Sequence, residues 1–372
     1  MSLNYKQAAK VIEKVLKKKC SVKTAIYQDD QIKNKTVILA IVSKTLSNSK
    51  VIEKLISDIK DFSTIKEHYT LLVMLNDFMT TGRISGGGAI KRMILANKES
   101  IPKLETQSTT PLFKYYRMNS LVTTQFPGIT NTVETDKEIP FLFKITPPLK
   151  LQIESLISQD KPSCFPAFIL NPEENSECID ACAAPGNKTT HLAAIMKNTG
   201  KIYAFDKDKK RAELLQKNVE KCNAKNVEVS CNDFLMVDPN DAKYEKVKYI
   251  LCDPSCSGSG ILERKNLGEK MDEERLKKLA EFQTSVVLHA LKFKNVKKVT
   301  YSTCSVNVEE NEMVVKRVLS QNKDFKLEKA LPSWERRGIK IDDELSYEDC
   351  VRVDPELDQM TGFFVALFVK ND

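Results

Sequence analysis

Apolar residues recur every three to four positions through the first hundred residues of the chain. The stripes are Ala8, Val11, Ile12 and Val15, then Ile38, Ile41, Val42 and Leu46, and finally Ile52, Leu55, Ile56 and Ile59. This spacing places the apolar side chains of each stripe on one face of an α-helix. The pattern predicts a helical domain over residues 1–105 whose stripes form its core, with a hinge between two helices at the glycine run 86–88.

Beyond residue 171 the pattern changes to short apolar runs that alternate with amphipathic stretches. The runs predict strands at 178–181, 201–205, 227–231, 249–252, 298–302 and 362–369, and the stretches between them predict helices at 188–197, 208–222, 273–291 and 308–321. Strands that alternate with helices are typical of a parallel sheet covered on both faces. We therefore predict an α/β domain of Rossmann-like type over residues 171–372.

Residues 106–170 form a proline-marked segment of mixed composition between these two domains. Residues 115–119 (Tyr-Tyr-Arg-Met-Asn) predict a short strand, and the pair Pro147 and Pro148 predicts a break. Adjacent aromatic rings beside an arginine can stack on unpaired RNA bases. The interpretation that we favour is that they are half-buried sheet residues.

Several unusual residues fall at the predicted carboxyl ends of the strands, where parallel sheets bind ligands. The loop at 183–188 (Ala-Ala-Pro-Gly-Asn-Lys) has small residues that let its backbone approach a ligand, and it leads into a helix N-terminus. It lacks the glycine spacing of NAD-binding loops. Asp206 ends the second strand, twenty residues after Gly186, where a carboxylate can bind both hydroxyls of a ribose.

Three further residues near this edge have more than one interpretation. Asp233 follows the third strand, where it can approach an adenine edge or cap a helix. Asp208 is better explained as the N-cap of the helix at 208–222, and Arg211 on that helix can reach back to a cofactor.

Two cysteines lie just after neighbouring predicted strands. Cys256 is in the turn at 253–260 (Asp-Pro-Ser-Cys-Ser-Gly-Ser-Gly), and Cys304 lies between Thr303 and Ser305. Methylation of a pyrimidine ring at carbon 5 requires one reactive thiolate, because carbon 5 becomes nucleophilic only after a thiolate has added to carbon 6. Backbone N–H groups near a helix start can stabilise the thiolate of Cys304. For seven other cysteines we expect small, buried apolar roles: Cys20, Cys164, Cys178, Cys222, Cys231, Cys252 and Cys350.

Composition narrows the class of protein. The ten cysteines have no disulfide framework, the N-terminus has no signal-peptide run, and no apolar stretch approaches the length of a transmembrane helix, so we expect an intracellular protein without a membrane span. We expect no metal site, because the chain has no C-x-x-C pair and its three histidines, His68, His191 and His289, are scattered.

Charge is distributed unevenly along the chain. Residues 1–100 carry 18 Lys and Arg against 9 Asp and Glu, whereas residues 171–372 carry 33 against 35. A basic domain attached to a neutral one is typical of a surface that binds the phosphates of RNA. The same distribution is equally typical of solvated, lysine-rich helix faces.

Five segments in chain order resemble the motifs of one enzyme family. They are DACAAPGNKTTHLAA (180–194), AFDKDKKR (204–211), NDF (232–234), LCDPSCSGSG (251–260) and YSTCSVNVEENE (301–312). Together they resemble the Sun-domain family of RNA cytosine-5 methyltransferases. The helical N-terminus and the Leu-Pro-Ser-Trp segment at 331–334 are similar to the branch that acts on large-subunit ribosomal RNA. The stretch between residues 119 and 159, which in relatives carries a small RNA-recognition-like subdomain, is short here.

The resemblance implies a class I methyltransferase fold that uses S-adenosylmethionine, and it implies roles for individual residues. Cys304 would be the nucleophile, Cys256 would help to break the covalent adduct, Asp253 would bind the exocyclic amine of cytosine, and Lys188 would help to hold the base or the cofactor. The residues implied to bind or shape the pocket of S-adenosylmethionine are Cys182, Ala183, Ala184, Pro185, Gly186, Asn187, Lys188, Asp206, Arg211, Asp233 and Asp253.

The resemblance also implies the partners: RNA, above all large-subunit ribosomal RNA or pre-ribosomal particles, with residence in the nucleus or nucleolus if the organism is eukaryotic. We expect a monomer. The alternative from another class is a noncatalytic assembly factor that keeps the fold and binds pre-ribosomal RNA. The presence of both thiols argues against it, because a pure binding protein has no chemical need for them.

Overall fold

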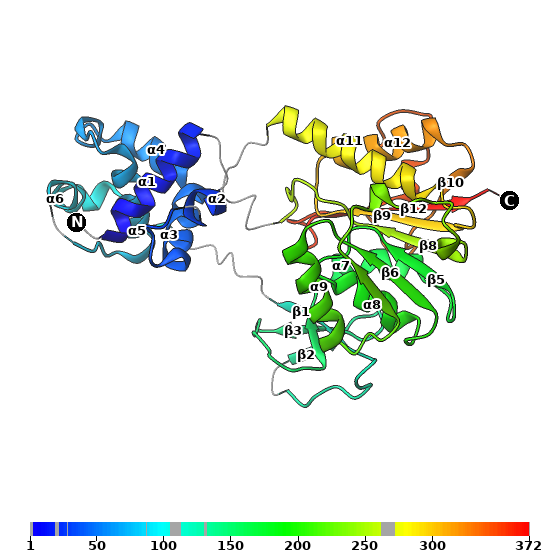
Figure 1. The fold of residues 1–372 in the computed structure, drawn as a ribbon. Helices are drawn as coiled ribbons and strands as arrows, with labels where there is room; N and C mark the ends of the chain where they lie inside the picture. Colours follow the sequence, from blue (N-terminus) through cyan, green and yellow to red (C-terminus); the bar gives the residue numbers. More distant parts are fainter. Residues whose placement is uncertain are drawn as a thin grey trace. The chain divides into compact units, whose positions relative to one another are not determined.

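The computed structural model describes residues 3–18, 22–27, 29–86, 88–104, 113–129, 132–261 and 272–371. Two compact units divide the chain: the described residues of the first are 3–104, and those of the second are 113–261 and 272–371 (Figure 1). No helix in these ranges is both long and apolar enough to cross a lipid bilayer.

The first unit is helical, as the apolar stripes predict. Its helices are α1 (Leu3–Lys18), α2 (Val22–Tyr27), α3 (Lys35–Ser47), α4 (Ser49–Asp58), α5 (His68–Thr81) and α6 (Ala89–Ala96), with short 3₁₀ turns at Phe62–Thr64 and Lys98–Ser100. The helix α5 is the central one, because its residues from Thr70 to Asn76 are all buried. The three predicted stripes pack in the same core. The glycine run separates α5 from α6, and Gly87 lies outside the described residues.

The second unit is built on a large sheet in the strand order β10-β12-β9-β8-β5-β6-β7. The strands β5 to β9 pair in parallel, whereas β12 pairs antiparallel with β9, β10 and the short β11. The strands are β5 (Glu177–Asp180), β6 (Lys201–Phe205), β7 (Val227–Ser230), β8 (Val247–Cys252), β9 (Lys298–Thr303), β10 (Phe325–Glu328), β11 (Val351–Val353) and β12 (Phe363–Lys370). The predicted α/β fold and its predicted strands are therefore confirmed.

Helices cover both faces of this sheet (Figure 1). They are α7 (Lys161–Leu170), α8 (Asn187–Ile195), α9 (Lys209–Lys221), α11 (Glu273–Ala290) and α12 (Glu312–Gln321), with 3₁₀ turns at Phe234–Met236, Ala242–Tyr244, Val308–Glu310 and Tyr347–Asp349. Successive residues of β6 alternate between the two cores: Ile202 packs with α8 and α9, and Tyr203 packs in the core that includes α11 and α12. Burial on both faces explains why the strands read as continuous apolar runs.

A small antiparallel sheet precedes α7 and has the order β2-β3-β1-β4. Its strands are β1 (Lys114–Met118), β2 (Thr132–Thr135), β3 (Leu142–Thr146) and β4 (Leu156–Ser158). The side chains of Tyr115, Tyr116 and Arg117 on β1 are all buried. The hypothesis that they stack on RNA bases is therefore wrong, and the sheet-core interpretation is confirmed.

One cysteine departs from its expected role. Cys231 is exposed, whereas Cys164, Cys178, Cys222, Cys252 and Cys350 are buried as predicted. Cys231 follows β7, which is an edge strand with no neighbour on its far side and only half-buried residues. Cys20 lies outside the described residues.

Two glycines allow the loop after β8 to cross the start of β12. The Gly260 N–H donates to the carbonyl of Cys304 at 3.0 Å, and the Gly362 N–H donates to the carbonyl of Gly260 at 2.8 Å. A Cβ atom added at Gly260 would lie 2.2 Å from the carbonyl oxygen of Gly362. The close approach of the two backbones therefore requires glycine, and it holds the Cys304 backbone against the loop that carries Cys256.

We predict that Gly260→Ala destabilises the second unit. Overpacking of a closely packed site typically costs up to about 3 kcal/mol, and here the obstacle is backbone that has no alternative rotamer. Urea denaturation followed by circular dichroism would measure the change. Gly128→Ala is the matched control, because a Cβ atom there meets nothing within 4 Å, so its effect should stay within about 0.5 kcal/mol. Equal stability of the two variants would contradict the prediction.

Candidate active site

Two cavities lie at the carboxyl edge of the parallel strands. The first is lined by Ala181, Cys182, Asp206, Lys207, Arg211, Asn232, Asp233, Phe234, Ser255, Phe282 and Val286. The second, of about 310 Å³, is lined by Asp160, Ser163, Lys188, Asp253, Pro254, Cys256, Ile261, Cys304, Thr361 and Phe363. The loop after β8 lies between the cavities, because its residue Ser255 faces the first and its neighbours Pro254 and Cys256 face the second.

The first cavity has carboxylates at the ends of two neighbouring strands. Asp206 follows β6; its Oδ1 accepts from the Asp208 N–H at 3.0 Å, and its Oδ2 pairs with Arg211 at 3.1 Å. Asp233 follows β7, and its carboxylate accepts from the Leu235 N–H at 3.1 Å. Asp233 therefore both caps a 3₁₀ turn and lines the cavity, so its two interpretations are compatible.

The loop between β5 and α8 is held from the helix that follows β6. Arg211 donates to the carbonyl of Ala184 at 2.9 Å, and Asn218 donates to the carbonyl of Pro185 at 2.8 Å. Gly186 has a φ of 109°, and a Cβ atom there would lie 3.0 Å from the side chain of Leu215. Only glycine combines this backbone conformation with this close approach to α9.

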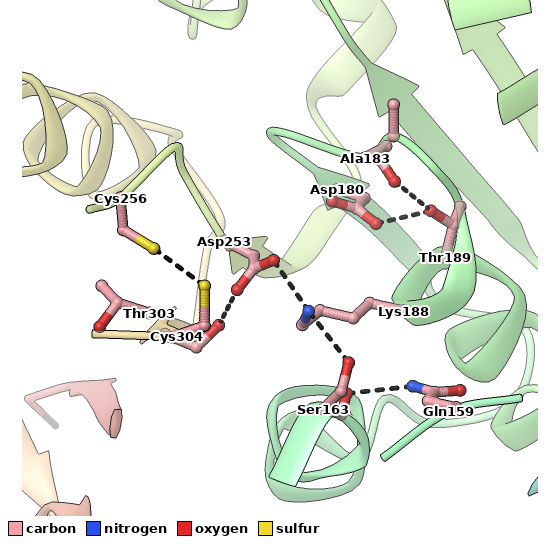
Figure 2. Close-up of polar contacts among 12 residues, drawn as sticks. Gln159, Ser163, Asp180, Ala183, Lys188, Thr189, Asp253, Cys256, Thr303 and Cys304 are labelled. Atoms are coloured by element: carbon pink, nitrogen blue, oxygen red, sulfur yellow. Dashed lines mark hydrogen bonds and ion pairs between the residues drawn. The ribbon is translucent and has the colours of Figure 1, made fainter. Parts of the chain in front are cut away.

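Lys188 and Asp253 form an ion pair within the second cavity. The Lys188 Nζ lies 2.8 Å from the Asp253 Oδ2 and donates to the Ser163 hydroxyl at 3.3 Å, as Figure 2 shows. The other Asp253 oxygen accepts from the Ser302 hydroxyl at 2.6 Å. Burial by itself would lower the pKa of Lys188, but the Asp253 carboxylate raises it above its ordinary value. Lys188 is therefore charged, and the pair is held in place by Ser163 on one side and by Ser302 on the other.

The two predicted thiols meet in the same cavity. The Sγ atoms of Cys256 and Cys304 lie 3.1 Å apart, and both side chains are half-buried (Figure 2). The contact with Cys304, together with burial, raises the pKa of the Cys256 thiol well above its ordinary value. The raised pKa keeps the proton on Cys256 at neutral pH, and in the contact itself either sulfur can be the donor.

A buried carboxylate joins the loops that carry the thiols. Glu310 is fully buried, and its Oε1 accepts from the Ser257 N–H at 2.8 Å and from the Gln283 amide at 3.0 Å. Its Oε2 accepts from the Ser257 and Ser305 hydroxyls and from the Asn307 amide. Ser257 follows Cys256 and Ser305 follows Cys304, so a single side chain fixes the relative position of the two sulfurs.

The predicted site residues divide between the two cavities. Those predicted to bind a cofactor that line the first cavity are Cys182, Asp206, Arg211 and Asp233. The residues predicted to be catalytic, Lys188, Asp253, Cys256 and Cys304, all line the second. Residues 183–187 line neither cavity and form the turn that leads into α8.

Sequence reasoning missed several residues of both cavities. Phe282 of α11 lines the first, and Ser163 of α7 and Phe363 of β12 line the second. Each lies at least 25 residues along the chain from any motif residue that lines the same cavity. The Asp-Lys-Pro-Ser run that opens α7 at 160–163 is a helix-start signal that could have indicated a positioned polar group.

Comparison with known sequences identifies one family. Residues 167–369 match the profile described as 16S rRNA methyltransferase RsmB/F. The 26S rRNA (cytosine-C(5))-methyltransferase nsun-5 of Caenorhabditis elegans is 31% identical over 98% of this chain and 98% of its own length. The 25S rRNA (cytosine-C(5))-methyltransferase rcm1 of Schizosaccharomyces pombe is 34% identical over 97% of this chain and 90% of its own.

A mouse relative and two solved structures extend the comparison. The 28S rRNA (cytosine-C(5))-methyltransferase of Mus musculus is 46% identical over 58% of this chain, and this chain spans 47% of its length. The crystal structure of PH0851 superposes with a TM-score of 0.68 at 20% identity, covering 100% of both chains. NSun6 from Pyrococcus horikoshii with SFG superposes with a TM-score of 0.58 at 20% identity, over 70% of this chain and 91% of its own. Both structures share the fold.

The titration of Asp180 generates a prediction for stability. This carboxyl at the end of β5 is buried, and burial raises its pKa from 3.8 to about 7; the Thr189 hydroxyl donates to its Oδ2 at 2.7 Å. Between these pH values the folded protein binds a proton that the unfolded chain has lost, so the stability that this proton supplies falls as the pH rises. From pH 5 to pH 7 the loss should be about 2 kcal/mol.

Urea denaturation of the wild type and of Asp180→Asn across this pH range would test the prediction. The variant has no carboxyl at this position. As the pH rises from 5 to 7, the free energy of unfolding of the wild type should therefore fall relative to that of Asp180→Asn. A constant difference would show that Asp180 does not titrate between pH 5 and pH 7.

Proposed function

The chain belongs to the RsmB/F family of ribosomal RNA methyltransferases, and from this we propose that it methylates carbon 5 of a cytosine in large-subunit ribosomal RNA with S-adenosylmethionine as the methyl donor. The relatives that cover nearly all of this chain carry that activity in their names. The observation that carries the chemical part of the proposal is the contact of the two thiols, Cys256 and Cys304, at 3.1 Å in one cavity.

The first cavity fits S-adenosylmethionine. Asp206 would bind the ribose hydroxyls, and Asp233 would bind the adenine edge beside the ring of Phe282. Cys182 and Arg211 complete its wall, and Arg211 also holds the neighbouring turn at 183–187 through the carbonyl of Ala184. When bound there, S-adenosylmethionine supplies a methyl group on a positively charged sulfur. NSun6 of P. horikoshii, with the same fold, was crystallised with SFG, which agrees with a cofactor site in this fold.

The second cavity fits an unstacked cytosine. Its walls carry an ion pair, Lys188 and Asp253, next to the two thiols. The Asp253 carboxylate can only accept hydrogen bonds, so it favours the exocyclic amine of cytosine over the carbonyl oxygen of uracil. Lys188 fixes that carboxylate and can also bind the base. Entry of the base requires that it leave its stack, which favours RNA loops or opened helices.

Cys304 is the proposed nucleophile. Its thiolate adds to carbon 6 of the cytosine, and the electron pair of the double bond moves to carbon 5, which then takes the methyl group. The carbon-5 proton then passes to water with the assistance of Cys256, the electron pair of the carbon–hydrogen bond re-forms the double bond, and Cys304 leaves as a thiolate. The proton that Cys256 retains suits it to stabilise the departing sulfur by a hydrogen bond.

The proposed substrate indicates the setting in which the protein works. Its proposed partner is large-subunit ribosomal RNA, free or in a pre-ribosomal particle, and the proposed location is the nucleus or nucleolus if the organism is eukaryotic. The lysine-rich helices of the first unit would add affinity for RNA phosphates that does not depend on base sequence.

We predict opposite outcomes for the two cysteine variants. With labelled S-adenosylmethionine and an unmodified large-subunit rRNA transcript, the wild type should label one cytosine. Cys304→Ala should label none and form no adduct, because no thiolate can add to carbon 6. Cys256→Ala should accumulate a protein–RNA adduct that survives a denaturing gel, because release is slowed after methyl transfer.

Binding of the same transcript by all three proteins is the control. RNA binding without label by the wild type, and without adduct by Cys256→Ala, would overturn the proposal in favour of a noncatalytic RNA-binding protein. An adduct through Cys256 in the Cys304→Ala variant would show that Cys256 is the nucleophile and that the proposed roles of the two thiols are reversed.

A further inference from the structure

Arg117 lies in the middle of the small sheet, on β1, and its side chain is 1% exposed. β1 is flanked by β3 and β4, and Arg117 pairs with Leu142 and Ile157 across the two ladders. No residue of the four strands β1 to β4 lines either cavity. The guanidinium nevertheless reaches the part of the second unit where the active site is built.

The guanidinium binds three neutral groups. Its Nε donates to the Gln159 Oε1 at 2.7 Å, and one terminal nitrogen donates to the Thr190 hydroxyl at 3.0 Å and to the carbonyl of Asn187 at 3.2 Å. Among the residues that the structure describes, no carboxylate pairs with Arg117, and burial lowers its pKa. A buried charge without a counter-ion opposes folding, so the stability of the fold does not explain its presence.

Two of these contacts, those with Gln159 and Asn187, lead to Lys188 from different directions. Gln159 donates through its Nε2 to the carbonyl of Ser163 at 3.0 Å, and the Ser163 hydroxyl accepts from the Lys188 Nζ at 3.3 Å (Figure 2). Asn187 is the residue before Lys188, so the bond to its carbonyl holds the peptide from which the Lys188 side chain leaves. Arg117 thus holds both the backbone of Lys188 and the group that its ammonium binds.

We propose that Arg117 is a positioning residue, which sets Lys188, and through it Asp253, at the cavity of the two thiols. The inference rests on the proposed function, since it assigns to the small sheet a part in that reaction. Arginine suits this role because its planar group binds several acceptors in fixed directions, which a lysine ammonium on a flexible stem does not. A displacement of about 1 Å at a reacting group costs on the order of a hundredfold in rate. A residue outside the cavity can therefore be essential for catalysis if it positions a side chain inside it.

Arg117→Met tests the proposal, because methionine fills similar space without the charge or the donors. In the Cys256→Ala background, the rate of adduct formation with the rRNA transcript should fall about tenfold or more. RNA affinity should stay within about twofold. The readout is the rate of the folded protein, because removal of a buried charge is offset by the unpaired acceptor left on Gln159. Arg117→Lys should recover only part of the rate.

Asn119→Ala is the matched control from the end of the same strand. Its side-chain amide is fully buried and donates to the carbonyl of Cys222 at 2.8 Å, at the far end of α9 from the active site. A purely structural role of Arg117 predicts that both variants lose stability and keep the rate of the folded protein. That result would overturn the proposal.

A double-mutant cycle identifies the residue through which Arg117 acts. If it acts through Lys188, Arg117→Met should slow adduct formation little further once Lys188→Met is present, because the two substitutions remove one interaction. Additive losses would contradict the assignment. If the Arg117 variants do not fold, Gln159→Met removes the contacts that link Arg117 to Ser163. A double-mutant cycle of Gln159→Met with Lys188→Met then shows whether these contacts act through Lys188.

A crystal structure of Arg117→Met separates the inference from the proposed function. The Lys188 Nζ and the Asp253 carboxylate, 2.8 Å apart in the wild type, should part to beyond 4 Å. An unchanged ion pair would refute the positioning role even if the enzyme is active. If the wild type forms no adduct with RNA, the proposed function fails, whereas the structure of the variant still decides whether Arg117 positions Lys188.

Discussion

The buried carboxylate of Glu310 is the constraint on which the arrangement of the two thiols depends. It accepts hydrogen bonds from the loop after β8 and from the loop after β9, through Ser257 and Ser305 among others. A buried charge is tolerated only when its hydrogen bonds are made, so each loop must adopt the conformation that presents its donors. The same conformations place the sulfurs of Cys256 and Cys304 in contact.

The roles proposed for the two thiols agree with the charges around them. The contact with Cys304, burial and the carboxylates of Glu310 and Asp253 all raise the pKa of Cys256. The sulfur of Cys304 in turn supports the charge of Lys188. The two identical side chains therefore have different surroundings: Cys256 is near the carboxylates of Glu310 and Asp253, and Cys304 interacts with the cation of Lys188.

Three features of the second unit position the site at the edge of the sheet. The parallel strands place the motif loops at one edge. The close approach of Gly260 and Gly362 packs the loop after β8 against the start of β12. The hydrogen bond of Arg117 to the carbonyl of Asn187 connects the small sheet to Lys188. The last of these gives the small sheet a connection to the chemistry although its aromatic residues are buried.

The sequence by itself determined the elements and the loops that carry the chemistry. Its helical and strand periods are local properties, and parallel strands bring their carboxyl ends to one edge, so Cys256, Cys304 and Asp253 could be expected near one another. Tertiary structure alone decided the contacts: the thiols touch across 48 residues of sequence, Arg117 binds Gln159 across 42, and Cys231 is exposed because its strand is an edge. Buried polar contacts between distant residues depend on how elements pack, and no local pattern encodes that packing.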